Sequence, residues 1–312
     1  MNKPLLFKLF LSFMLLSVQM TRGQEYIPLA ITSGFNEDVI AETSPANEHT
    51  TAAVDATSVG SNFAFMSRAY PDATVGLPAN GLITSVATAT PGLQFQLGAY
   101  NASNSLKINA QNGTGTLTVQ STYPALKIFI LATSGSAASN FTGTITFTDG
   151  TTQEISTQSV PNWFQTGTPA VAIQGIGRVP RSGGNPDNNS TNPKLFQIPI
   201  AIATANQSKL VQSIAITKTS STSSYLNILA VSAEYIPACP KPTAFTRGSV
   251  SATDAMLSWT STGTSFEVKY GATDFDVATE GTTVTSTTNS RTIVGLTTGQ
   301  TYDAYVRTNC GE

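Results

Sequence analysis

Residues that could carry out catalysis are few in this chain of 312 residues, which has a single histidine, His49. A Ser-His-Asp or Cys-His system could form only around it, and the sequence has no Gly-x-Ser-x-Gly motif to supply a nucleophile. His49 lies in a polar segment, so the alternative is a solvated loop histidine without chemistry. The chain also lacks a His-Glu-x-x-His motif and a nucleotide-binding glycine pattern. We therefore expect no catalytic constellation within residues 1–312.

Carboxylates are the next candidates, because a glycosidase needs two of them, one with a raised pKa. They are scattered through the first two thirds of the chain: Glu37, Asp38, Glu42, Glu48, Asp55, Asp72, Asp149, Glu154 and Asp187. The position of Asp149 is best explained as that of a hairpin turn residue. Asn36, Glu37 and Asp38, with Glu42 as a further oxygen donor, could hold a structural calcium ion. Their spacing fits no defined calcium loop, and we expect no other cofactor.

A polar loop, residues 178–194, is the candidate ligand-binding segment. It combines two arginines, several amides and one carboxylate, which could bond to sugar hydroxyls, while the nearby Trp163 could stack on a pyranose face. The candidate residues are Trp163, Arg178, Arg181, Asn185, Asp187 and Asn192. The alternative is a solvated surface loop with Trp163 buried in the fold.

Composition indicates how these residues are positioned. Charged residues make up 11% of the chain, against roughly 25% in average domains. Thr, Ser, Asn and Gly take their place, which favours strands and turns with a neutral, hydroxyl-rich surface. The net charge of −2 gives no electrostatic basis for binding nucleic acid or an anionic membrane.

Residues 1–23 have the pattern of a secretory signal peptide: Lys3 and Lys8 flank an apolar run, and small or polar residues follow. We expect a secreted or cell-surface protein with no membrane span after cleavage. Export makes a disulfide the leading interpretation of the two cysteines, Cys239 and Cys310. Two free thiols are the alternative.

Period-two alternation and turn signals predict an all-β region over residues 24–237. Two hairpins are expected, one around Asn112-Gly113 between strands 106–109 and 116–119, and one around Asp149-Gly150. The nearly continuous apolar run 125–132 predicts a central strand that is covered on both faces. No segment has a sustained helical period, so we expect a sandwich of two antiparallel sheets.

This region resembles the jelly roll of galactose-binding-like (discoidin-like) domains. The resemblance rests on the FIL strand at 129–131, the hairpin TFTDGTTQEI at 146–155 and the closing strands VQSIAITK and YLNILAVSAEY. It implies an antiparallel jelly-roll sandwich whose end loops bind glycans. The Pro-punctuated segment 237–242 marks the expected domain boundary.

Residues 238–312 resemble a fibronectin type III domain, an immunoglobulin-like sandwich. The resemblance rests on AMLSW at 255–259, SFEVKYG at 265–271, and the Leu296–Tyr302 spacing of a tyrosine corner. It implies that Cys239 and Cys310 meet at one end of the sandwich. The seventh strand is missing from the sequence, so we expect a fragment of a longer protein or a strand donated by another chain.

The tandem of signal peptide, sandwich and type III domain resembles secreted or cell-surface proteins of bacteria. The leading hypothesis is a non-catalytic binding or adhesion protein that recognises carbohydrate or another surface ligand. The alternatives are an accessory region of a secreted hydrolase whose catalytic domain lies beyond residue 312, and a purely structural cell-surface protein.

Overall fold

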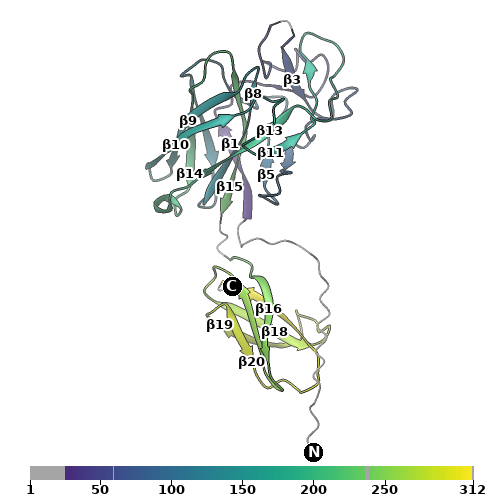
Figure 1. Ribbon diagram of the computed structural model, residues 1–312, viewed down its shortest axis with the longest axis vertical. Coiled ribbons are helices and arrows are strands. Elements are labelled where there is room, and N and C mark those ends of the chain that lie inside the picture. The colour runs from purple at the N-terminus through teal and green to yellow at the C-terminus, as the bar shows by residue number, and fades with distance from the viewer. Residues whose placement is uncertain (1–24, 59, 236–238, 311–312) are drawn as a thin grey trace, which may run out of the picture. The chain divides into compact units, whose positions relative to one another are not determined.

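The computed structural model describes residues 25–58, 60–235 and 239–310. The predicted signal peptide, residues 1–23, lies outside them. The chain forms two compact units, Glu25–Tyr235 and a C-terminal unit described here over 239–310. Strands dominate both units (Figure 1), which confirms the all-β fold class. In the described part the one helical segment is a short 3-10 helix, Thr204–Asn206, and no helix there is long and apolar enough to span a membrane.

The N-terminal unit contains two large antiparallel layers. The inner sheet has the order β1-β15-β8-β13-β11, with β6 also paired to β15. Its strands are β1 (Glu25–Ser33), β6 (Leu106–Ile108), β8 (Lys127–Gly135), β11 (Val171–Gln174), β13 (Lys194–Ala201) and β15 (Tyr225–Tyr235). The outer sheet has the order β10-β9-β14-β7-β1. Its other strands are β7 (Thr114–Gln120), β9 (Ser139–Phe147), β10 (Thr152–Val160) and β14 (Val211–Lys218).

Strand β1 belongs to both sheets. Its first part pairs with β15, from Glu25 opposite Tyr235 to Leu29 opposite Val231. Its second part pairs with β7, beginning with Ala30 opposite Gln120, and the register shifts before Ser33. The chain thereby joins the two layers along one edge.

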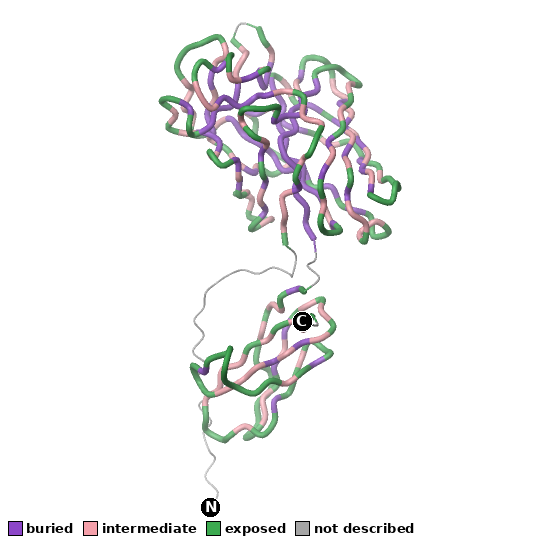
Figure 2. The backbone as a smooth tube through the Cα atoms, turned by 180° about the vertical axis from the view of Figure 1, so that it is seen from behind, coloured by how far each residue is buried: buried purple, intermediate pink, exposed green. Residues whose placement is uncertain are grey.

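The inner sheet is covered on both faces, as the apolar run 125–132 predicts. On β8, Ile128, Ile130 and Ala132 face the core shared with the outer sheet. The intervening Phe129 and Leu131 face a second core on the other side. A side-chain period of two puts successive residues on opposite faces, so an apolar run without polar interruption is what a doubly covered strand requires. Figure 2 shows these buried segments gathered inside the N-terminal unit.

The second face is covered by a loop layer, defined as residues 34–58, 60–104, 161–170 and 175–193. It contains the short strands β2 (Ile40–Ala41), β3 (Phe63–Met66), β4 (Leu82–Thr84), β5 (Gln94–Gln96) and β12 (Val179–Pro180). These form a small β12-β3-β2 sheet and a β4-β5 pair. Its apolar side chains, among them Phe65, Phe95 and Trp163, pack on the inner sheet.

One of the two predicted hairpins is present in the structure, and the other is not. The Asp149-Gly150 hairpin is confirmed, because β9 pairs with β10 across that turn. The hairpin around Asn112-Gly113 is wrong: β6 pairs with β15, whereas β7 pairs with β1 and β14. The chain crosses from one sheet to the other at this turn, so the apolar faces of β6 and β7 meet across the core and not along a shared ladder.

The C-terminal unit consists of two three-stranded antiparallel sheets, β16-β17-β20 and β19-β18-β21. Their bounds are β16 (Thr243–Val250), β17 (Ala255–Thr260), β18 (Phe266–Ala272), β19 (Thr282–Ser286), β20 (Ser290–Ile293) and β21 (Tyr302–Thr308). The core is built on Trp259, Phe266 and Val268. The Thr297 amide donates to the Tyr302 hydroxyl at 3.1 Å, which closes the expected tyrosine corner. These features confirm a type III-like β-sandwich.

A disulfide joins Cys239 to Cys310, with their Cα atoms 5.8 Å apart. The bond confirms the leading interpretation of the two cysteines over free thiols. It ties the segment before β16 to the residues after β21. Disulfides of this kind are typical of extracellular proteins.

Candidate functional site

The arginines of the predicted binding loop are engaged within the fold. The Arg178 guanidinium stacks 3.8 Å from the ring centre of Phe63 and 4.6 Å from that of Phe164. Its Nε also pairs with Asp187 Oδ2 at 3.0 Å, and the backbones of Arg178 and Asp187 bond to each other in both directions. Stacking and ion pairing occupy both the face and the edge of the guanidinium. Arg178 and Asp187 therefore close the base of the loop.

Arg181 fastens the same loop to the segment that carries His49. Its Nε donates to Thr50 Oγ1 at 2.7 Å, and its Nη2 donates to the Thr50 carbonyl at 2.9 Å. Thr50 Oγ1 in turn donates to the Ala46 carbonyl. This chain of hydrogen bonds holds segment 46–50 in place.

The other predicted loop residues have different surroundings. Trp163 is 2% exposed and packs edge-to-face on Phe65, so it has no ring face free for a sugar and corresponds to the buried alternative. Asn192 accepts a hydrogen bond from Lys194. Asn185 is exposed, and its side chain makes no hydrogen bond within the described residues.

The side chains of the three residues proposed to hold calcium are hydrogen-bonded to different parts of the protein. The Asn36 amide bonds to the backbone of Lys107 in both directions. Glu37 Oε2 accepts from Thr51 Oγ1 at 2.6 Å, while Asp38 Oδ1 accepts from the Ile40 amide and from Asn104. The described residues contain no group of three or more His, Cys, Asp or Glu side chains that could hold a metal ion.

A cleft in the loop layer is the stronger candidate site. Its volume is about 410 Å³, within the range of small-molecule sites. The polar side chains on its walls are those of Glu42, Ser67, Asn80, Gln96, Tyr100 and Asn101. Between them lie small residues, including Gly81, Gly98 and Ala99.

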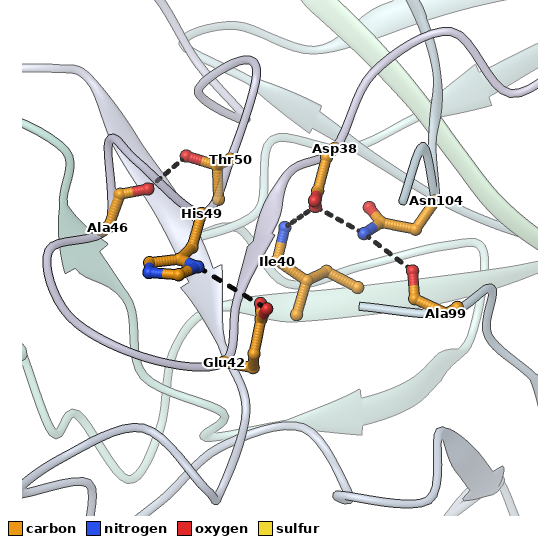
Figure 3. Close-up of polar contacts among 8 residues, drawn as sticks. All are labelled: Asp38, Ile40, Glu42, Ala46, His49, Thr50, Ala99 and Asn104. Carbon is orange, nitrogen blue, oxygen red and sulfur yellow. Dashed lines mark hydrogen bonds and ion pairs between the residues drawn. The ribbon is translucent and has the colours of Figure 1, made fainter. Parts of the chain in front are cut away.

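The Glu42 carboxylate is the charged group of this cleft and is incompletely satisfied. Its Oε1 lies 3.8 Å from His49 Nδ1 (Figure 3), while its Oε2 is buried and has no hydrogen-bond partner. A buried polar atom without a partner costs free energy, more so for a charged group. The side chain as a whole is 28% exposed and lines the cleft.

Buried polar contacts fix the position of Glu42. It directly follows β2, and Asp38 and Asn104 brace the start of that strand (Figure 3). Asn104 is fully buried; its Oδ1 accepts from the Val39 amide at 3.0 Å and its Nδ2 donates to Asp38 at 2.6 Å. The same Nδ2 lies 3.5 Å from the carbonyl of Ala99, on the cleft wall. Asn104 thus ties the two walls together.

Burial raises the pKa of Asp38 to about 6, despite the opposing hydrogen bonds from the Ile40 amide and Asn104. The nearby Glu42 carboxylate raises this pKa further. Burial also raises the pKa of the Tyr100 phenol, which donates to the Pro78 carbonyl at 2.6 Å. Tyr100 is therefore neutral and offers the cleft an aromatic edge.

The cleft can accept and donate hydrogen bonds but offers no strong nucleophile. Gln96 Nε2 is already bonded to the carbonyls of Asn80 and Leu97, which leaves its Oε1 as an acceptor. The Asn101 side chain is exposed and makes no hydrogen bond within the described residues. In the sequence, Glu42 is one of several scattered carboxylates and a further oxygen donor for calcium. The amides around it have no pattern that marks them.

No protein-family model matches the chain, and no curated protein sequence matches it either. Among solved structures, the chain is similar to a two-domain fibronectin type III segment of chicken tenascin, with 11% identity, 66% of this chain and 90% of that chain covered, and a TM-score of 0.26. The FN1–FN3 domains of chicken CNTN1 match at 12% identity, with 65% and 57% covered and a TM-score of 0.22.

A beta-1,2-glucanase from Parabacteroides distasonis matches at 12% identity, with 73% of this chain and 32% of that chain covered and a TM-score of 0.22. These scores are too low to relate the complete fold to any of the three. We therefore infer function from the residues of the cleft.

Proposed function

We propose that this protein is an extracellular, non-catalytic binding protein whose N-terminal unit holds a polyhydroxylated ligand of the sugar class in the Glu42 cleft. The galactose-binding-like jelly roll is its scaffold in this proposal, and the type III-like unit acts as a spacer or interaction module. The observation that carries the proposal is the buried Oε2 of Glu42, which has no donor in the wall of a polar cleft.

The chemistry of the walls supports this ligand class. A sugar presents several hydroxyl groups that both donate and accept, and the cleft has a carboxylate and an amide oxygen to accept, with the Asn101 amide to do both. Leu97 and the Tyr100 ring supply apolar surface for C–H groups.

Location is supported by the disulfide in the C-terminal unit, which persists in oxidising compartments. The signal-peptide pattern of residues 1–23 points the same way.

The test is a glycan array with the full chain, with added calcium and again with a chelator, followed by calorimetry on the best sugar. We expect Glu42→Ala and Asn101→Ala each to weaken binding about tenfold or more. Glu48→Ala is the matched control, because Glu48 is an exposed glutamate in the same segment and does not line the cleft.

Unchanged affinity in both cleft variants, combined with a loss in Asn185→Ala, would return the site to the 178–194 loop. An array with no bound sugar under either condition would overturn the sugar proposal altogether.

A further inference from the structure

We infer that the ligand of the Glu42 cleft carries a protonated amine beside its hydroxyl groups, as in an amino sugar with a free amino group. The inference rests on the proposed function and specifies its ligand class. It comes from the charge of the cleft, which neutral hydroxyl groups would leave unbalanced.

The cleft has a negative charge and no positive one on its walls. Glu42 is the charged side chain among its lining residues, which include no lysine and no arginine. Within the described part of the chain, His49 is the one basic side chain within ion-pair distance of Glu42, and it meets Oε1 at 3.8 Å, too far for a hydrogen bond. The carboxylate therefore has no charge-assisted donor of its own.

Cations near this region are used elsewhere. The Arg181 guanidinium donates hydrogen bonds to Thr50 and Asn62. Lys107, buried beneath the loop layer, donates its Nζ to the carbonyls of Ala53 and Asp55. Neither side chain has a hydrogen bond to Glu42, so a cation from the ligand would have no competitor for the Glu42 carboxylate.

An ammonium group supplies the hydrogen-bond donors that the Glu42 carboxylate lacks, and it does so better than a hydroxyl group. It has three N–H donors, of which one can meet the Glu42 carboxylate, and the side chains of Gln96 and Asn101 are further oxygen acceptors on the walls of the cleft. Hydrogen bonds between an ammonium and a carboxylate are roughly twice as strong as neutral ones. Conversely, an acidic sugar would set its charge against Glu42.

The experiment compares matched sugars at about pH 6.5, where an amine of this kind carries its proton. Calorimetry on the full chain would use D-glucosamine, D-galactosamine and D-mannosamine. Each is paired with its parent hexose and its N-acetyl derivative, so that only the substituent at one carbon changes.

We expect at least one amine to bind about tenfold more tightly than both of its counterparts, and to weaken as salt is added. Glu42→Gln keeps the shape of the side chain and should remove the preference for the amine, while Glu48→Gln should retain it. Circular dichroism of each variant checks that the fold is intact.

The outcomes separate the two proposals. If a parent hexose or an N-acetyl sugar binds as tightly as its amine, the amine inference is overturned and the sugar-binding function stands. If the amine preference persists in Glu42→Gln, the inference also fails. If none of the nine sugars binds at millimolar concentration and the array is empty as well, both proposals fall.

Discussion

Replacing Asp38 by asparagine should stabilise the N-terminal unit at neutral pH and leave its stability nearly unchanged in acid. Asp38 is 6% exposed, and its Oδ1 accepts from the Ile40 amide and from Asn104. An asparagine keeps that acceptor oxygen and has no charge to bury. The variant therefore removes the desolvation cost while it preserves the contacts that brace β2.

The magnitude follows from the pKa, which rises from an ordinary 3.8 to about 6 on folding. Below the lower value the carboxyl is protonated in both states, and its charge costs nothing. Between the two values the unfolded chain releases its proton first, so stability falls as pH rises. Above about 6 the full cost remains, and the pKa difference converts to up to about 3 kcal/mol.

The assay is urea unfolding of the wild type and Asp38→Asn at a series of pH values from about 3 to about 8. The chain has two tryptophans, one in each unit, so both proteins carry Trp259→Phe and the fluorescence of Trp163 reports on the N-terminal unit alone. Other titrating groups are shared by the two proteins and cancel in the difference.

We expect the stability difference between variant and wild type to increase across the interval from pH 4 to pH 6 and then to level off. Glu48→Gln, an exposed carboxylate in the same segment, should show no such increase. A difference that stays constant from acid to neutral pH, or that falls as pH rises, would refute the idea that Asp38 is held at an energetic cost.

Three further predictions concern packing and cross-links. Removing the disulfide with Cys239→Ser and Cys310→Ser should lower the stability of the C-terminal unit by about 4 kcal/mol, the loop-entropy value for a separation of 71 residues. Trp259 fluorescence during denaturation measures this loss, and a loss below about 1 kcal/mol would contradict the prediction. Tyr302→Phe should cost the same unit about 1 kcal/mol, because the Thr297 amide loses its acceptor, and an unchanged unfolding midpoint would count against the corner. Gly135→Ala should destabilise the N-terminal unit by about 1–3 kcal/mol, because a methyl group there would overlap the backbone of Val54 and Asp55; Gly248→Ala, which meets only ordinary contacts, is the control for the same melting experiment.

Local signals in the sequence were sufficient where a structural requirement lies within a few residues. The apolar run at 125–132 predicted a doubly covered strand because alternate side chains of β8 enter two different cores. Asp149-Gly150 predicted its hairpin because the turn alone sets that pairing. The type III-like unit was recognised from its core Trp259 and its corner Tyr302, both of which have fixed neighbours along the chain.

Contacts between distant segments could not be predicted in this way. Asn112-Gly113 has the same local chemistry as a hairpin turn, but the choice between a shared ladder and a crossing depends on β15, more than a hundred residues later. The sequence identifies Arg178 as a potential hydrogen-bond donor. It does not reveal that the rings of Phe63 and Phe164 stack on its guanidinium.

The cleft is the extreme case of this limitation. Its walls come from segments 42, 67–69, 79–81 and 96–101, which have little secondary structure and no periodicity. Only the fold of the loop layer places Glu42 in one cleft with these amides, and only the structure shows that its buried Oε2 lacks a hydrogen-bond partner.

The pairing of β1 with β15 delays closure of the inner sheet during synthesis of the chain. Glu25 pairs with Tyr235, so the first strand of the N-terminal unit must wait for the last one before the inner sheet can close. At about 5–20 residues per second, a ribosome needs roughly 10–40 s to make the intervening stretch. During that time the apolar face of β1 lacks its main partner, so the unit is exposed to aggregation as a nascent chain until Tyr235 has emerged.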